Sequence, residues 1–302
     1  MHPRLSTELP LAPRIRLENI MIKDVLVHLD GTPRDEERLQ HAEAIAAISQ
    51  AHVTGLLTTP LPDIPLIAPM DGGAAAAGIL ASLNAEAQAA GDALQKKLAD
   101  RLARLPVSSE VRRLDGTFGQ IAHDAASEAR WADLLVMSRP YDMDAREQWD
   151  TLFEAVLFGG GRGVLVVPPN HRPADAIRRI LVCWRDTREA ARAVAEAIPF
   201  LERATKVTIL TVDPDRRKGD GAGEPTADIA RHVSRFGAPV EVTIAQSEGR
   251  DVSEVILDQA RRFSADLIVM GGYGHSRARE WIIGGATRNT LSTSEFPILM
   301  AH

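Results

Sequence analysis

The amino-acid sequence predicts an α/β protein in which one unit, a parallel sheet with helices on both faces, is written twice. Short apolar runs rich in Val, Ile and Leu alternate with longer segments of helical periodicity, an order typical of βαβ units. A hexapeptide occurs twice with one substitution, as ADLLVM at 132–137 and as ADLIVM at 265–270. The 302 residues suffice for two such units.

The first unit runs from its first apolar strand to a pair of prolines. Its predicted strands are Val25–Leu29, His52–Thr58, Ser109–Leu114, Leu134–Met137 and Val164–Val167. Its predicted helices are Arg34–Gln50, Ile79–Leu105 and Phe118–Arg130. The second of these helices carries a single apolar stripe, because its Ile, Leu and Ala residues recur every three or four positions.

The second unit repeats this order. Its predicted strands are Ile180–Trp184, Lys206–Val212, Val240–Ala245, Leu267–Met270 and Pro297–Met300, and its predicted helices are Thr187–Leu201 and Val252–Phe263. Apolar runs this short, bounded by turn residues, are typical of strands buried on both faces. The residues predicted to build the core of the sheet are Leu26, Leu135, Val166, Leu181, Ile209, Ile268 and Leu299.

The first unit is longer than the second. The two hexapeptides start 133 residues apart, as do Gly116 and Gly249, whereas the first strands start 155 residues apart, at Val25 and Ile180. The first unit therefore holds 22 extra residues, which we assign to the Pro- and Ala-rich stretch 60–92. We expect a surface loop and an extended helix there, packed on the same long helix or at a subunit contact.

Composition restricts the class of protein. The formal net charge of −6 argues against a broad nucleic-acid surface, and no apolar run approaches the roughly 20 residues of a membrane helix. The single cysteine, Cys183, lies in an apolar run and is interpreted as a core thiol, which suits a reducing cytoplasm. Residues 1–20 lack the apolar centre of a signal peptide and are interpreted as a flexible extension.

The segment 265–287 carries the strongest functional signal. The apolar run 267–270 ends at Gly271, and further glycines follow at Gly274 and Gly284. Glycines at the carboxyl end of a strand let the backbone approach a ligand closely, and free N–H groups with a helix N-terminus behind them bind anions. Taken singly, each glycine is also explained by a turn.

This glycine spacing resembles the nucleotide loop of the universal stress protein family, in its ATP-binding branch, and the resemblance extends over nearly the whole chain from Met21. It implies two tandem domains of the flavodoxin-like, Rossmann-like class (adenine nucleotide alpha hydrolase-like), each with a five-stranded parallel sheet. We expect the domains at 21–168 and 177–302, joined by a proline-stiffened linker at 169–176. The resemblance also implies that they pair through their last strands as an internal pseudo-dimer, and a homodimer of the whole chain is a further expectation.

The resemblance implies an adenine-nucleotide site in the second domain, for ATP with Mg²⁺ present only alongside the nucleotide. The residues expected to form it are Val212, Met270, Gly271, Gly274, Gly284, Gly285, Ala286 and Thr287. Two positions depart from the family pattern. Gly285 replaces a hydroxyl residue, for which Thr287 is the substitute, and Arg185 replaces the Asp that meets the adenosine, with Asp186 beside it.

The first domain departs in the opposite way. It keeps Asp30, but its fourth strand is followed by Ser138-Arg139-Pro140-Tyr141, without the loop glycines, and proline removes a donor N–H. The run 158–163 is glycine-rich, yet the helix that follows the loop in the second domain is expected to be absent here.

Several side chains that could be interpreted as catalytic can also be explained without catalysis. His28 and Asp30 lie two apart on a strand and so face the same way, but no nucleophile accompanies them. Arg277 and Arg279 can reach phosphates or form a solvated face, and His275 can be a surface imidazole or a general base. Residues 281–283 are expected to pack as helix core, and His302 to be free. The histidines show no metal-ligand spacing.

Three functions remain open at this point. The first is a cytoplasmic stress-response or signalling protein that binds an adenine nucleotide weakly and is not an enzyme. The second is a tandem module that has lost nucleotide binding and acts through its surface on a protein partner that the sequence does not name. The third is a slow ATPase or nucleotidyl transferase.

Overall fold

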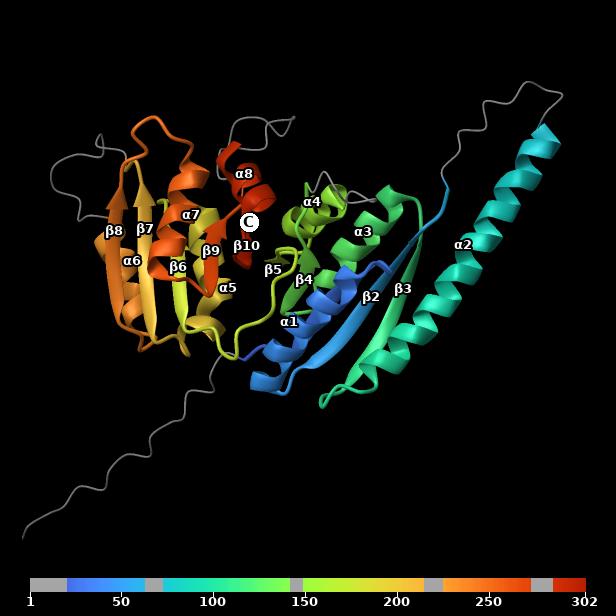
Figure 1. Cartoon of the computed structure of the whole chain (residues 1–302), viewed down its shortest axis with the longest axis horizontal. Coiled ribbons are helices and arrows are strands. Elements are labelled where there is room, and N and C mark those ends of the chain that lie inside the picture. The colour runs from blue at the N-terminus through green and yellow to red at the C-terminus, as the bar shows by residue number, and fades with distance from the viewer. Residues whose placement is uncertain (1–20, 63–72, 142–148, 215–224, 273–284) are drawn as a thin grey trace, which may run out of the picture.

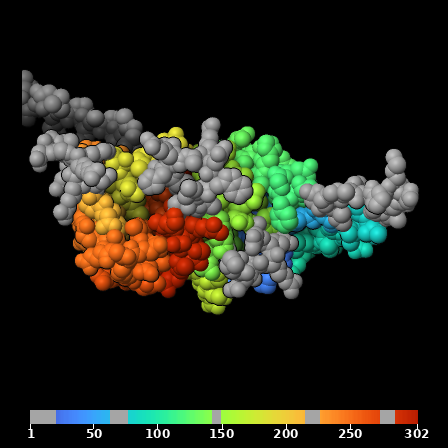
Figure 2. Space-filling model, turned by 90° about the horizontal axis from the view of Figure 1, so that it is seen from above, coloured from blue at the N-terminus to red at the C-terminus, as the bar shows by residue number. Residues whose placement is uncertain are grey.

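The structure, a computed structural model, describes residues 21–62, 73–141, 149–214, 225–272 and 285–302. The described strands form one ten-stranded sheet in the order β3-β2-β1-β4-β5-β10-β9-β6-β7-β8. The two halves of the chain lie next to each other along this sheet (Figures 1 and 2). The predicted α/β architecture with a parallel sheet in each half is therefore confirmed.

The first half supplies the strands β1 (Asp24–Leu29), β2 (His52–Pro60), β3 (Ser109–Gly116), β4 (Leu134–Ser138) and β5 (Gly163–Val167). Its helices are α1 (Arg34–Ser49), α2 (Gly73–Leu102), α3 (Phe118–Ala129) and α4 (Asp150–Gly159). The predicted strands end within two residues of the observed ones. The helix α4 corrects the prediction from the sequence, in which no helix was expected before β5.

The second half supplies the strands β6 (Arg179–Cys183), β7 (Lys206–Val212), β8 (Val240–Ala245), β9 (Leu267–Gly271) and β10 (Ile298–Ala301). Its helices are α5 (Arg188–Leu201), α6 (Pro225–Ser234), α7 (Val252–Phe263) and α8 (Gly285–Thr293). The predicted bounds of β7, β8 and α7 are confirmed to the residue. The helix α6 is an element that the sequence interpretation did not name.

The two halves are joined by an antiparallel pairing of β5 with β10. Ile298 pairs with Val166, Leu299 with Leu165 and Met300 with Val164. All other strand pairs in the described sheet are parallel. Because this one pair is antiparallel, the carboxyl end of β10 lies beside the start of β5, and the carboxyl end of β9 lies on the other side of β10.

Each face of the sheet is covered by four of the described helices. One apolar cluster contains side chains of α1, α2, α5 and α6, such as Leu39 and Phe200, and the other contains side chains of α3, α4, α7 and α8, such as Phe153 and Leu291. All seven residues predicted to build the sheet core are at most 2% exposed, which confirms them. Among the described helices, none combines the length and apolar character needed to cross a membrane.

The repeated hexapeptide has a physical cause. Asp133 accepts the backbone N–H groups of Lys23 and Asp24 at 2.7 and 3.1 Å, which fixes the start of β1 beside β4. Asp266 accepts those of Arg178 and Arg179 at 2.9 and 2.8 Å, at the start of β6 beside β9. The two hexapeptides thus occupy equivalent places in the sheet, as predicted.

The extra residues of the first half lengthen α2. The helix begins at residue 73, earlier than predicted, and its first part extends past the edge of the sheet (Figure 1). Its expected apolar stripe packs only near the C-terminal end, where Leu98 and Leu102 are buried, whereas Ile79 is 61% exposed. The expected packing of the earlier part is therefore not found among the described residues, and residues 63–72 lie outside them.

We predict that Asp133→Ala lowers the free energy of unfolding by roughly 1–3 kcal/mol, because two backbone donors lose a charged acceptor. Urea unfolding at neutral pH measures the change. Asp124→Ala, which removes an exposed carboxylate from α3, is the matched control and should stay within about 0.5 kcal/mol of the parent chain. Equal losses in both variants would show that Asp133 does not fix the start of the strand.

Candidate functional site at the carboxyl ends of the strands

An open parallel sheet binds ligands beyond the carboxyl ends of its strands, where the strand order reverses. Here those points lie between β1 and β4 and between β6 and β9. The register makes the two edges comparable, because Val25 pairs with Leu134 as Ile180 pairs with Leu267. Asp30 and Arg185 follow these strands at the same distance along the chain and are therefore equivalent.

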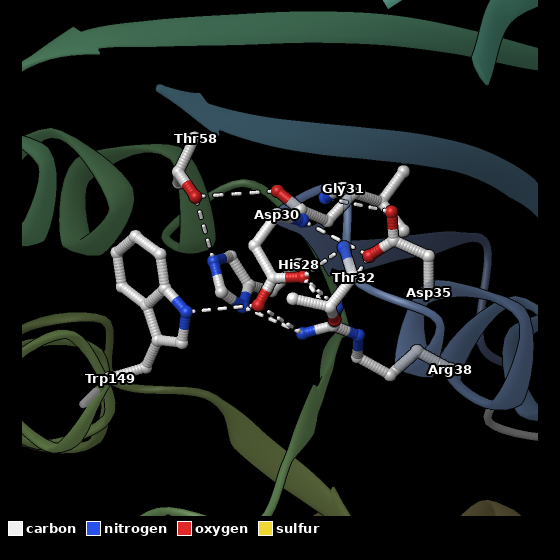
Figure 3. A network of polar contacts seen from close by, with 9 residues as sticks. His28, Asp30, Gly31, Thr32, Asp35, Arg38, Thr58 and Trp149 are labelled. Carbon is white, nitrogen blue, oxygen red and sulfur yellow. Dashed lines mark hydrogen bonds and ion pairs between the residues drawn. The ribbon is translucent and has the colours of Figure 1, made fainter. Parts of the chain in front are cut away.

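At the edge of the first half, a fully buried guanidinium organises the polar groups (Figure 3). Arg38 reaches back from α1 and forms ion pairs with Asp30 at 2.6 Å and with Asp35 at 2.5 Å. A buried cation of this kind is tolerated only when its partners are in place, because desolvation of an unpaired charge costs several kcal/mol.

The same guanidinium sets the protonation of His28. Nη1 of Arg38 donates to Nδ1 of His28 at 3.2 Å, so Nε2 carries the proton and donates to the hydroxyl of Thr58 at 3.0 Å. Burial, reinforced by the charge of Arg38 and opposed by that of Asp30, lowers the pKa of His28 to about 3. The imidazole is therefore a neutral link, and both of its ring nitrogens are hydrogen-bonded inside the protein.

The two carboxylates have different environments. Burial opposes ionisation of Asp30, but the charge and hydrogen bonds of Arg38 and a hydrogen bond from Thr32 hold its pKa well below the usual range. Asp35 accepts the backbone N–H groups of Asp30 and Gly31 at 3.0 and 2.9 Å, and burial raises its pKa to about 6 against the pull of Arg38. Gly31 has φ +79°, so this turn favours glycine.

Aromatic side chains fill the rest of this edge. Trp149, just before α4, donates its indole N–H to Asp30 at 2.9 Å and packs edge-on against His28, with ring centroids 4.7 Å apart. Phe118, at the start of α3, covers Trp149 at 5.4 Å and is itself 44% exposed. The first half therefore places its own side chains where a ligand would bind, and the intact Asp30 is already paired.

The second half replaces this buried network with small or apolar residues. Equivalent residues, in the first half and then the second, are His28 and Cys183, Asp35 and Ala190, Arg38 and Ala193, and Thr58 and Val212. Most buried positions of α5 lie 155 residues after buried positions of α1, which is also the distance between the first strands Val25 and Ile180. This agreement supports the correspondence along the two helices. Cys183 and Val212 are half-buried, whereas His28 and Thr58 are at most 2% exposed. The Cys183 thiol, predicted from the sequence to lie in the core, is therefore only partly covered, and burial raises its pKa to about 12, so that it stays protonated.

The described glycines of this edge have different surroundings. A Cβ added at Gly271 would come within 2.5 Å of the backbone nitrogen of Ala190, so glycine here permits close packing of α5 on β9. One at Gly272 would meet Leu157 of α4 at 2.9 Å. One at Gly285, at the exposed start of α8, would meet nothing within 4 Å.

The other expected site residues divide into two groups. Met270 is buried beneath the edge, and Ala286 and Thr287 are half-buried in the first turn of α8. Gly274 and Gly284 lie outside the described residues, as do His275, Arg277, Arg279 and the segment 281–283. The sheet and α8 thus bring the strand ends and the helix start to one edge, and the assignment of these residues to a nucleotide remains a prediction.

The last residue of the chain was expected to be free, and the structure corrects this. Nδ1 of His302 donates to the carbonyl oxygen of Gly272 at 3.0 Å, and Nε2 accepts from Arg188 at 3.3 Å. Phe158 of α4 packs edge-on against the ring at 4.7 Å. The first half therefore contributes to the candidate edge of the second.

The described residues provide no metal cluster, because no group of three His, Cys, Asp or Glu side chains among them converges on one point. The residues equivalent to His28 and Asp30 are Cys183 and Arg185. These two side chains cannot form the pair of an imidazole base and an orienting carboxylate that hydrolysis would use. The start of α8 and the exposed guanidinium groups of Arg185 and Arg188 remain at this edge, and groups of this kind bind anions.

The chain is similar to known proteins in two comparisons, one of sequence and one of structure. Residues 176–302 match the sequence model of the universal stress protein family. Over 92% of its length the chain is similar to a universal stress protein from Archaeoglobus fulgidus, with TM-score 0.66, 16% identity and 97% of that chain covered. It is also similar to a functionally unknown protein from Pseudomonas aeruginosa, with TM-score 0.56, 17% identity, and 93% of this chain and 92% of that one covered. No curated protein matches the sequence.

We predict that the free energy of unfolding falls as the pH drops below about 6.5. In the unfolded chain His28 takes up a proton at the ordinary histidine pKa of 6.5, whereas in the folded chain its pKa of about 3 keeps the imidazole neutral. The resulting slope approaches ~1.4 kcal/mol per pH unit. His41, whose pKa is lowered to about 4, acts in the same direction, and Asp35, whose pKa is raised, acts in the opposite one.

Comparison with His28→Gln isolates the contribution of this residue, because glutamine keeps a donor and an acceptor but does not titrate. Urea unfolding of both chains between about pH 7.5 and 5 should give a shallower pH dependence for the variant. Parallel curves for the two proteins would contradict the assignment of a neutral buried imidazole.

Proposed function

Because residues 176–302 form a domain of the universal stress protein family, we propose that the chain is a cytoplasmic stress-response module whose second half binds an adenine nucleotide, with ATP as the expected ligand. One observation carries this proposal. The first half fills its ligand edge with Arg38, Trp149 and Phe118, whereas the equivalent edge of the second half is lined by half-buried Cys183 and Val212.

In this proposal the phosphates bind backbone N–H groups between Gly271 and Gly285, together with the start of α8. Thr287 supplies the hydroxyl that Gly285 lacks. The adenosine packs against Val212, with Met270 beneath the site, and Mg²⁺ is held by the phosphates. Since Arg185 stands where a carboxylate would receive the adenosine, the affinity for ATP should be on the order of micromolar or weaker.

Binding, without catalysis, is the proposed activity. In this proposal, nucleotide binding changes the surface around α8, and a partner protein recognises the changed surface. Slow ATP hydrolysis would require a base, and at the positions equivalent to His28 and Asp30 the second half carries Cys183 and Arg185. The alternative of a module without nucleotide is favoured by the replacement of the carboxylate, and the next experiment decides between them.

We predict that two substitutions abolish ATP binding measured by calorimetry. Gly274→Val blocks the backbone approach that the phosphates need. Val212→Trp places a large ring at the edge of the second half, as Trp149 does in the first. Each should weaken binding beyond detection while the protein stays folded by circular dichroism.

Phe118→Ala is the control, because it changes the exposed rim of the other edge. It should leave ATP binding unchanged. Loss of binding in this control, with binding retained in Gly274→Val, would place the site in the first half. If the unmodified chain takes up no ATP, the module acts without a nucleotide.

A further inference from the structure

The two edge strands of the described sheet, β3 and β8, differ in how they are protected (Figure 1). An edge strand presents unpaired N–H and C=O groups, and soluble proteins usually protect them with charged side chains or a covering element. In a parallel sheet a residue directs both of its backbone groups to the same side, so alternate residues of an edge strand face away from the sheet. The hydrogen bonds of the neighbouring strand identify which residues these are.

The outer edge of β3 is protected by charges and by a helix. Leu61 donates its N–H to the carbonyl oxygen of Gly116, so the even-numbered residues of β3 bond to β2 and the odd-numbered ones direct their backbone groups outward. Arg113 is one of the outward residues. Its side chain forms ion pairs with Asp115 at 2.6 Å and with Asp92 of α2 at 2.5 Å. A second strand that approached this edge would have to displace these charges.

The outer edge of β8 is aliphatic. Asp213 donates its N–H to the carbonyl oxygen of Ala245, so the odd-numbered residues of β8 bond to β7. The outward residues are therefore Val240, Val242 and Ile244. The side chain of Val240 packs on the core, whereas Val242 is 45% and Ile244 is 54% exposed. Among the described strands, none pairs with this side of β8.

The register shows which residue was exchanged. Arg113 of β3 lies opposite Leu57, and Ile244 of β8 lies opposite Thr211, which is the equivalent place by the correspondence given above. The charged residue of the first edge is thus replaced by an exposed isoleucine at the second. Since free backbone groups beside exposed aliphatic side chains favour pairing with another strand, β8 has the properties of an interaction edge.

The edge of β8 is complementary to a second copy of itself. In an antiparallel pair about a two-fold axis, with Val242 opposite the partner's Val242, Val240 lies opposite the partner's Ile244 at both ends. Each of these pairs exchanges two backbone hydrogen bonds, and aliphatic side chains that lie opposite each other add to the stability. The only charged residue of the strand, Glu241, then lies opposite the partner's Thr243, so like charges do not meet.

The chain already contains a contact of this kind, because three antiparallel residue pairs of β5 and β10 join its two halves. We propose that two copies of the chain associate through antiparallel pairing of their β8 strands, so that the sheet continues from one molecule into the next. The association does not depend on nucleotide binding. Because the β8 strands of two molecules are not tethered to each other, the dimer should be weak, with a dissociation constant on the order of 100 μM.

Sedimentation equilibrium tests the association, because it measures mass independently of molecular shape. At about 5 μM the chain should have its own mass of 32.8 kDa, and at about 300 μM most chains should be in dimers of twice that mass. Ile244→Lys places a charge on the edge, and Val242→Pro removes an outward N–H while the hydrogen bonds to β7 remain. Each variant should raise the dissociation constant at least roughly tenfold and keep the circular dichroism spectrum of the parent chain.

Ile79→Lys is the matched control, because it makes the same change at an aliphatic residue of α2 that is 61% exposed. This variant should dimerise as the parent chain does. A parent chain that keeps the mass of 32.8 kDa at about 300 μM would overturn the proposal. Association that is lost in Ile79→Lys and unchanged in Ile244→Lys would also overturn it, and would assign the contact to α2.

Disulfide cross-linking tests the register of the two strands. In a Cys183→Ser background, an introduced cysteine is the only one in the chain. Val242→Cys should cross-link two chains at least roughly fivefold faster than Thr243→Cys, because residues directly opposite each other have Cα atoms about 5.5 Å apart, within the range of a disulfide. An equal or faster reaction of Thr243→Cys would overturn this register. If neither variant cross-links at about 300 μM, pairing through β8 is wrong.

Discussion

The antiparallel pairing of β5 with β10 is the interaction on which the arrangement of the molecule depends. Only three residue pairs of the described strands join the halves, with Leu165 opposite Leu299 at the centre. They merge two parallel sheets into one and leave β3 and β8 as its edge strands. They also bring α4 of the first half against the strand ends of the second, where Phe158 meets His302. The candidate edge is thus built from both halves.

At the two edges, all members of the charged network are exchanged together, and electrostatics explains why. A buried guanidinium such as Arg38 is stable only with both of its carboxylates, and removal of one partner would leave an uncompensated charge. The second half has alanine at the positions of Arg38 and Asp35 and has also lost the equivalent of Asp30. A partial exchange would have been costly, whereas the full exchange leaves Arg185 in water. In the first half, the protein's own side chains occupy the edge where a ligand would bind. In the second half, the equivalent edge stays exposed.

Much of the fold could be predicted from the sequence because apolar runs and the repeated hexapeptide mark buried parallel strands directly. The helix α4 was missed because its glycine-rich end drew the interpretation, although Trp149, Leu152 and Phe153 already follow a helical spacing. The pairing of Asp30 was beyond a local reading, since Arg38 belongs to the next element and Trp149 is 119 residues away in the chain. The close packing of Gly271 against Ala190 could not be predicted either, because it depends on how α5 lies on β9, and the role of Gly271 in ligand binding stays a prediction.

The long helix α2 gives the molecule an unusual outline. Its 30 residues span about 45 Å, and only the later turns rest on the sheet (Figure 1). The earlier turns act as a rod attached to the end of an already extended sheet. Such a particle meets more friction in water than a sphere of the same mass. Its sedimentation and translational diffusion should therefore be slower than its chain length alone implies, and an elution volume taken at face value would overstate its mass.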